Sequence, residues 1–208
     1  MPKPKSKFKY TEEWLKLQPL ACGETALLAV FAHFGLPKTM LDLGCGNGHL
    51  CKLAAKLGTL SVGVDIALDS YRDNGLWKLA RFDLTKRLEI LDELPSLDGA
   101  VPDGRFELVV SWETGEHLPE AAADTYVDSI ARHVGRWLVF TAAEVGQGGD
   151  GHINCQPHEW WREKLEAQGL EYLPIYTERL RETWLWSTGA CSWYPRNVQV
   201  FTRKEPVP

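Results

Sequence analysis

A glycine-rich turn flanked by carboxylates is the first feature of this sequence that could bind a ligand. Residues 41–50 read Leu-Asp-Leu-Gly-Cys-Gly-Asn-Gly-His-Leu, which predicts a buried strand, a turn and the start of a helix. Glycines at alternate positions leave no side chain between the backbone and a ligand. Asp65 ends the next apolar run, where a doubly wound α/β fold places the acid that binds ribose hydroxyls. The turn is therefore predicted to bind a nucleotide cofactor.

The spacing of the glycines separates two classes of nucleotide-binding protein. The dinucleotide fingerprint G-x-G-x-x-G needs a glycine where this chain has His49. No Tyr–Lys or cysteine-based catalytic pair is evident either, so an NAD-dependent oxidoreductase is the weaker alternative. The pattern D-x-G-x-G-x-G that remains, from Asp42 to Gly48, resembles motif I of the class I S-adenosylmethionine (SAM)-dependent methyltransferases. The similarity is to bacterial and phage methyltransferases of the small-molecule type.

The resemblance continues from about residue 40 to residue 140. In that family an acid follows the second strand, as Asp65 does, and another often follows the third strand near the adenine, as Asp83 does. A polar loop follows the fourth strand, here Ser-Trp-Glu-Thr-Gly-Glu-His-Leu-Pro at residues 111–119. The resemblance implies SAM as the cofactor, bound by Asp42, Gly44, Cys45, Gly46, Asn47, Gly48, Asp65, Ile66, Asp83, Leu84 and Trp112.

The same resemblance implies in-line transfer of a methyl group to an acceptor. A methyl sulfonium is already activated, so the protein must mainly orient the acceptor and remove a proton where needed. His117 and His152 are the candidate bases, because both fall in loops at the ligand-binding edge and imidazole titrates near neutral pH. A structural hydrogen bond is the competing interpretation for His117. The predicted substrate-binding residues are Glu113, Glu116, Asn154 and Trp160.

Neither a metal site nor a disulfide is predicted. A divalent metal needs several converging oxygens, and Asp65, Asp83 and Glu113 already have cofactor or loop roles. The five cysteines are scattered, odd in number and contain no C-x-x-C pair, which argues against a disulfide framework and against zinc. They indicate a reducing cytoplasm instead. No signal peptide is expected at the polar start of the chain, and no stretch approaches the ~20 apolar residues of a membrane span.

Composition narrows the range of partners. The net charge of -5 argues against a protein that mainly binds nucleic acid, although four lysines between residues 3 and 9 form a local basic segment, interpreted as a solvated tail. DNA amino-methyltransferases carry a D-P-P-Y or N-P-P-Y loop after the fourth strand, and cytosine C5 methyltransferases carry a Pro-Cys nucleophile there. This chain has neither motif at that place. The expected acceptor is a small molecule or a glycan-like hydroxyl. A SAM-binding module without turnover remains an alternative, and the oligomeric state is open.

Alternating apolar strands and helices predict one domain over residues 1–208. We expect a helical cap at 1–37, a cofactor-binding core at 38–141 and a substrate-side part at 142–208. The fold class is α/β: a Rossmann-like, doubly wound, mostly parallel seven-stranded sheet with helices on both faces and an antiparallel C-terminal strand. Strands are expected near 41–43, 60–64, 79–83, 106–112, 136–141, 170–176 and 197–202. Helices are expected at 11–15, 26–34, 50–57, 66–79, 119–134 and 158–168, with a glycine-rich lid at 142–157.

Overall fold

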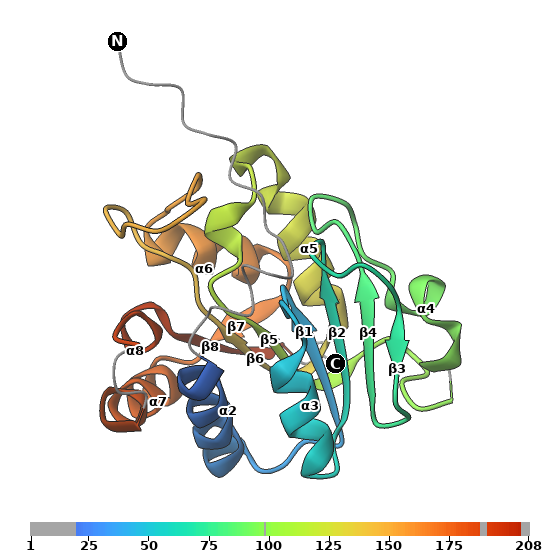
Figure 1. Ribbon diagram of the computed structural model, residues 1–208. Helices are drawn as coiled ribbons and strands as arrows, with labels where there is room; N and C mark the ends of the chain where they lie inside the picture. Colours follow the sequence, from blue (N-terminus) through green and yellow to red (C-terminus); the bar gives the residue numbers. More distant parts are fainter. Residues whose placement is uncertain (1–19, 98, 188–190, 205–208) are drawn as a thin grey trace.

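The computed structural model describes residues 20–97, 99–187 and 191–204, and an eight-stranded sheet runs through its centre (Figure 1). The strand order is β3-β4-β2-β1-β5-β6-β8-β7. The predicted helix at 11–15 and the basic segment before it lie outside the described residues. The strands are β1 Thr39–Leu43, β2 Leu60–Asp65, β3 Arg72–Asp73, β4 Trp77–Arg81, β5 Phe106–Ser111, β6 Val134–Phe140, β7 Leu170–Tyr172 and β8 Gln199–Arg203.

The pairing confirms the predicted doubly wound topology. Strands β4, β2, β1, β5 and β6 are parallel neighbours, while β8 runs antiparallel between β6 and β7. The chain builds the sheet outwards from β1 through β2 to β4, and then returns to place β5 on the other side of β1. Open α/β sheets bind ligands at the carboxyl ends of the strands beside such a switch point. The turn after β1 lies there.

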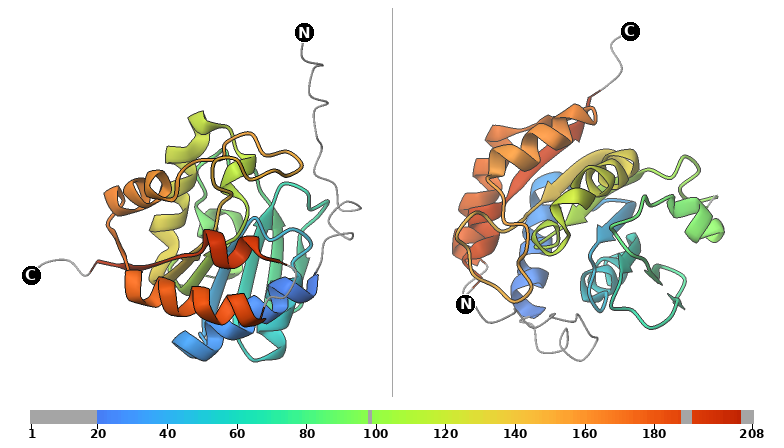
Figure 2. Two further views of the ribbon diagram at one scale, coloured as in Figure 1. Left: turned by 90° about the vertical axis from the view of Figure 1, so that its left-hand side faces the viewer. Right: turned by 90° about the horizontal axis from the view of Figure 1, so that it is seen from above.

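Helices cover both faces of the sheet (Figure 2). Residues of β1 alternate between two cores: Met40 packs with α2, α3 and α7, whereas Leu41 and Leu43 pack with α5 and α6. This alternation follows from the two-residue period of a strand, and the uninterrupted burial of β1 is typical of a parallel sheet. The helices are α2 Leu20–Phe34, α3 His49–Lys56, α4 Ile90–Glu93, α5 Ala123–His133, α6 His158–Ala167, α7 Pro174–Ser187 and α8 Trp193–Asn197.

The predicted helix at 66–79 is wrong. The chain instead forms a hairpin in which β3 pairs antiparallel with β4. Strand β3 is the additional strand that brings the sheet from the predicted seven strands to eight. Gly75, with φ of 73°, supplies the turn, and Lys78 Nζ contacts Asp73 Oδ2 across the pair at 2.6 Å. Turn residues at 73–75 and this cross-strand pair outweigh the weak helical spacing of the segment.

The predicted strand at 170–176 is too long, and the helix that follows it was not predicted. Strand β7 ends at Tyr172, and α7 begins at Pro174, a favoured residue for the first turn of a helix. Thr177, Leu180 and Trp184 are the buried residues of α7. Their spacing of three and four residues is a helical signal that the sequence carries.

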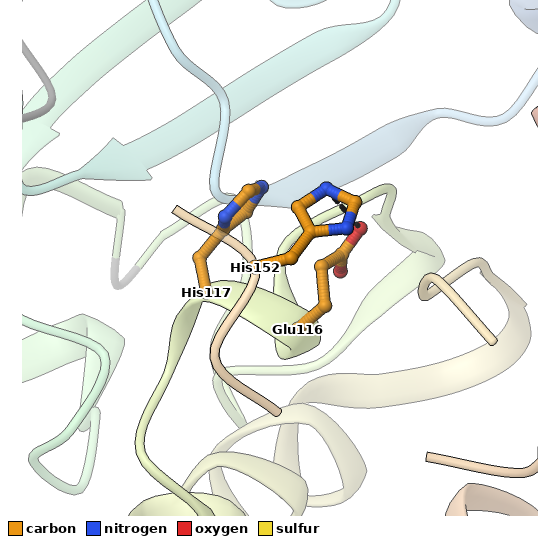
Figure 3. Close-up of side chains that lie close together, drawn as sticks. All are labelled: Glu116, His117 and His152. Atoms are coloured by element: carbon orange, nitrogen blue, oxygen red, sulfur yellow. Dashed lines mark ion pairs between the residues drawn. The ribbon is translucent and has the colours of Figure 1, made fainter. Parts of the chain in front are cut away.

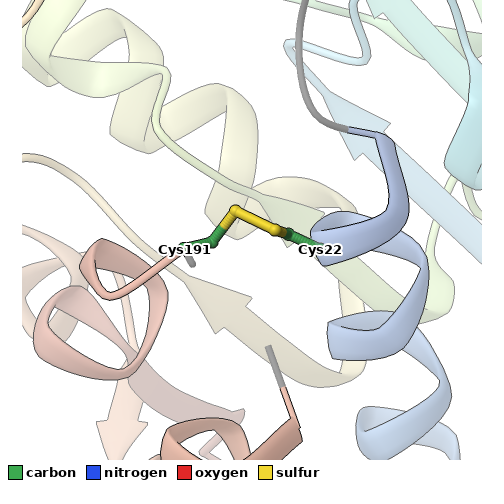
Figure 4. The surroundings of a disulfide bond; sticks show 2 residues. All are labelled: Cys22 and Cys191. Atoms are coloured by element: carbon green, nitrogen blue, oxygen red, sulfur yellow. A yellow bond between two sulfur atoms is a disulfide. The ribbon is translucent and has the colours of Figure 1, made fainter. Parts of the chain in front are cut away.

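A disulfide between Cys22 and Cys191 overturns the prediction that the cysteines would be unpaired (Figure 4). The two Cα atoms are 6.0 Å apart, although 169 residues separate the cysteines in sequence. Cys22 lies in α2 and Cys191 precedes α8, so only the tertiary fold brings them together. Cys45, Cys51 and Cys155 are free thiols. The cysteines therefore no longer argue for a reducing compartment.

Candidate active site

A cavity of about 660 Å³ opens at the carboxyl ends of β1, β2, β4 and β5. Thirteen predicted site residues line it, on both the cofactor and the acceptor side: Asp42, Gly44, Cys45, Gly46, Asn47, Asp65, Ile66, Asp83, Leu84, Trp112, Glu113, His117 and His152. The other four predicted residues, although described, lie outside its lining: Gly48, Glu116, Asn154 and Trp160. One cavity thus brings together residues that run along the chain from Asp42 in β1 to Arg196 in α8.

The glycines after β1 are required by backbone shape and by space. Gly44 has φ of 86°, and a Cβ on it would overlap the side chain of Thr114. Gly48 has φ of 75°, and a Cβ there would overlap Leu79. A side chain at either position would meet both strain and a clash. Gly48 therefore serves packing at the start of α3, and its predicted contact with the cofactor has no support in the cavity lining.

Asp65 holds the turn in place. Its Oδ2 accepts a hydrogen bond from the Gly46 N–H at 2.8 Å, and its Oδ1 accepts one from the Ala67 N–H, also at 2.8 Å. Burial raises the pKa of Asp65, while these two donors oppose the rise. Each carboxylate oxygen retains a second lone pair for a ligand hydroxyl. Asp65 thus fixes the cofactor turn and still faces the cavity.

Asp42 has an unsatisfied oxygen on the cofactor side, where His49 Nε2 also has no hydrogen-bond partner among the described residues. Asp42 is buried at the end of β1, and no described residue donates a hydrogen bond to its Oδ2. Burial, and then the negative charge of Asp65, raise the pKa of Asp42 to about 8. Asp83 differs, because hydrogen bonds from the Thr85 hydroxyl at 2.7 Å and from its N–H lower the pKa of Asp83. A cation bound nearby would therefore favour the ionised form of Asp42, whereas Asp83 would keep the same charge with or without the cation.

A polar network forms the acceptor side around Glu113, the residue after Trp112. Glu113 is the one described non-glycine residue with positive φ, at 49°. The Asn197 amide donates to Oε1 at 3.0 Å and to Oε2 at 3.2 Å, and Gln147 Nε2 donates to Oε2 at 3.3 Å. Burial raises the pKa of Glu113, and these donors oppose the rise. Neither Asn197 nor Gln147 was predicted, because they lie 84 and 34 residues further along the chain.

Glu116, His117 and His152 lie together beside this network (Figure 3). Glu116 is fully buried, and no described group gives either of its oxygens a hydrogen bond of normal geometry. Its Oε1 is 4.0 Å from His152 Nε2. Burial, and then the charge of Glu113, raise the pKa of Glu116 well above its usual value. Figure 3 shows the carboxyl group directed at the His152 ring.

Of the two histidines, His117 is a weak base. Burial lowers the pKa of His117 to about 4, and its ring lies edge-on to that of His152 at 4.9 Å. One candidate ligand atom from each of Glu116, His117 and His152 lies within 4.8 Å of the others. A carboxylate with two imidazoles is a donor set that a divalent metal could use. The predicted absence of a metal therefore stays a prediction.

Two predicted substrate residues lie away from the cavity. Asn154 is buried, its N–H donates to the Glu116 carbonyl at 3.0 Å, and its Oδ1 accepts from Gln156 Nε2 at 2.8 Å. Trp160 stands perpendicular to Trp161 at 4.8 Å and has Lys164 Nζ over its ring at 4.5 Å. These contacts favour structural roles for both.

The C-terminal part of the chain completes the wall. Trp193 and Tyr194 line the cavity, in the aromatic segment expected to cap the sheet or the pocket. Tyr194 packs against Trp112 at 5.6 Å, and Trp112 Nε1 donates to the Val139 carbonyl at 3.1 Å. The aromatic rings thus separate the cofactor side from the core beneath it.

The residues present fit SAM. SAM carries a sulfonium and an ammonium cation beside a carboxylate, and its ribose offers two hydroxyls. Asp42 is a buried carboxyl group that lacks a partner on Oδ2, the glycine turn leaves the backbone open, and Asp65 has spare lone pairs. Bound there, SAM would supply the activated methyl group, with Asp83 and Trp112 in the same wall.

The sequence of the chain is similar to those of known methyltransferases. A family model described as a methyltransferase domain matches residues 14–189. The ubiquinone biosynthesis O-methyltransferase of a Bradyrhizobium species is 27% identical over 70% of this chain and 50% of its own. The chloroplastic tocopherol O-methyltransferase of Arabidopsis thaliana is 33% identical over 41% of this chain and 24% of its own. The chain thus spans about a quarter to a half of these relatives.

Solved structures of other proteins share the fold of this chain. A TehB-like SAM-dependent methyltransferase from Corynebacterium glutamicum has a TM-score of 0.57 at 20% identity, with 93% of this chain and 95% of that one covered. A chain from the Haloferax volcanii complex of the Trm112 activator with a putative methyltransferase has a TM-score of 0.64 at 16% identity, covering 96% and 100%. With the family model matching most of its length, the chain belongs to the class I SAM-dependent methyltransferases.

Proposed function

We propose that this chain transfers the methyl group of SAM to a hydroxyl group of a small aromatic acceptor. One observation carries the proposal: the glycine turn and His152 line the same cavity, the first as a cofactor site and the second as a proton acceptor, with Glu116 behind His152. The names of two relatives, the ubiquinone biosynthesis and the tocopherol O-methyltransferases, refer to small molecules, which favours such an acceptor over a glycan. A cytoplasmic location stays a prediction.

We assign the base to His152. Its Nδ1 lies 3.3 Å from the Gln147 carbonyl, which suits a protonated Nδ1 and leaves Nε2 free to accept the acceptor's proton. With SAM held at the glycine turn and Asp65 and supplying the activated methyl group, His152 Nε2 would take up the proton that the acceptor hydroxyl loses. The buried Glu116 carboxyl group, whose Oε1 is 4.0 Å from Nε2, lies beside the imidazolium that would form. His117 is a poor base at neutral pH because its pKa is about 4.

Labelled SAM and a panel of phenols and catechols test the proposal. We expect His152→Ala to lower methyl transfer by about 100-fold or more, the usual contribution of a general base, with unchanged affinity for S-adenosylhomocysteine (SAH). His33→Ala is the matched control, because His33 is exposed and bonded to Thr183 away from the cavity. Full activity of His152→Ala would remove the assigned base. Tight SAM binding without transfer to any acceptor would favour the alternative of a module without turnover.

A further inference from the structure

The disulfide fastens one wall of the cofactor cavity. We call residues 191–198 the cap segment; it includes α8 and leads into β8. Cys191 lines the cavity, as do Trp193, Tyr194 and Arg196 of the same segment. The partner cysteine, Cys22, lies in the first turns of α2 (Figure 4). A covalent bond thus joins the first described helix to the wall of the cavity.

The start of α2 lies against the cofactor turn. A Cβ placed on Gly23, the neighbour of Cys22, would be 3.3 Å from His49 Nε2 and 3.6 Å from the Tyr194 hydroxyl. His49 is the first residue of α3 and follows the glycine turn directly. The disulfide therefore sits where α2, the cofactor turn and the cap segment meet.

Tyr194 of the cap segment packs against Trp112 and Trp184 at 5.6 and 5.7 Å, and side-chain hydrogen bonds hold the C-terminal half of the segment. Arg181 Nε donates to the Pro195 carbonyl at 2.9 Å. The Asn197 amide donates to Glu113 and to Gln147 Oε1, the latter at 3.0 Å. At the N-terminal end the disulfide holds Cys191 itself. Opening the bond would remove the covalent tie at the end of the segment beside the cofactor, while the end beside Glu113 keeps its hydrogen bonds.

We propose that the Cys22–Cys191 disulfide is a redox-sensitive clasp of the cofactor site, and that its reduction by a dithiol loosens the cap segment and weakens binding of SAM and SAH. The proposal rests on the proposed function and adds a regulation of the same site. It also accounts for a disulfide placed at a cavity wall.

Reduction of the Cys22–Cys191 disulfide is a thiol–disulfide exchange in two steps. One thiolate of the dithiol attacks Sγ of Cys22, which is half-buried, whereas Cys191 is only 1% exposed. The bond between the two protein sulfurs breaks, and Cys191 leaves as a thiolate that takes up a proton. The second thiol of the reagent then displaces Cys22. The dithiol is oxidised to a cyclic disulfide, and the protein gains two electrons and two protons.

Calorimetric titration with SAH tests the clasp in the full chain. Thiol titration of denatured protein should count three thiols before reduction and five after it, since the chain has five cysteines and one disulfide. We expect dithiothreitol to weaken SAH binding about tenfold, a usual size for coupled sites. Cys22→Ser and Cys191→Ser should match the reduced protein with or without reductant. Cys155→Ser, which removes a free thiol, should match the wild type.

A second measurement does not depend on any variant folding. Coupling is reciprocal, so saturating SAH should disfavour reduction of the disulfide by the same factor of about ten. Circular dichroism must show that the reduced chain stays folded at the temperature used. Equal SAH affinity before and after complete reduction, or five thiols in protein purified without reductant, would overturn the clasp. Oxidised protein that binds no SAH would instead overturn the proposed function, so the two failures are distinct.

Discussion

The two ends of the cavity are built in different ways. At the cofactor end, Asp42, Gly44 and Asp65 come from the ends of two neighbouring strands, and their contacts span about 20 residues. At the acceptor end, Glu113 is held by Gln147 and Asn197, from a glycine-rich loop and from α8. The first end is assembled by local chain geometry, and the second by long-range packing. Variants at the two ends should therefore fail in different ways.

The largest expected effect is on folding, at the cofactor turn. Gly44→Ala should lower the free energy of unfolding by about 3 kcal/mol, because strain at positive φ adds to the clash with Thr114. Gly35→Ala is the matched control: its φ is 84°, but no described atom lies within 4 Å of the added Cβ. It should cost about 1 kcal/mol, from strain alone. Equal losses in urea denaturation would show that the turn is not tightly packed on the acceptor loop.

Next in size is the loss of the acid that holds the turn. Asp65→Ala should weaken SAH binding about 100-fold, close to 2.7 kcal/mol, since hydrogen bonds to a charged group contribute about 1.5–3 kcal/mol each. Asp83→Asn should weaken it about tenfold at most, because the Asp83 carboxylate is already bonded to Thr85. Calorimetry would measure both. A larger loss for Asp83→Asn would reverse the assigned roles of the two acids.

A smaller, pH-dependent effect is expected at Asp42. Its pKa of about 8 in the free protein means that the carboxyl is mostly protonated at pH 7. The ammonium group of SAH, held beside Asp42, would expel this proton, so SAH affinity should rise by about tenfold per pH unit below that pKa. Asp42→Asn should flatten this dependence. Equal slopes for wild type and Asp42→Asn would show that Asp42 is not coupled to the ligand.

The smallest effect on cofactor binding is expected at Glu116, the buried carboxyl of the other end. Because burial raises its folded-state pKa, the native protein holds a proton that the unfolded chain releases above about pH 4.5. Stability should thus fall as the pH rises from there through the folded-state pKa. Glu116→Gln should lessen that fall and change SAH affinity less than about twofold. A large loss of SAH affinity would mean that the two ends are not separate.

Much of the fold was predictable because strongly apolar segments alternate with turns. The strands around Leu41, Val62 and Val109 were found at once, since a buried parallel strand is apolar on both faces. The helical spacing of residues 66–79 predicts a helix that the chain does not form, because turn chemistry at Gly75 and the Lys78–Asp73 pair outweigh periodicity. Helix α7 was missed although its buried residues carry the right spacing.

The sequence by itself determined the cofactor half of this protein: the glycine turn, the acids after the strands and the doubly wound sheet. These features rest on φ/ψ limits and on strand order, which act over short stretches of chain. Only the tertiary structure decided the acceptor half, the Asn197–Glu113 contact and the Cys22–Cys191 disulfide. Such contacts join positions up to 169 residues apart, and no local rule of spacing or composition encodes which distant side chains packing brings together.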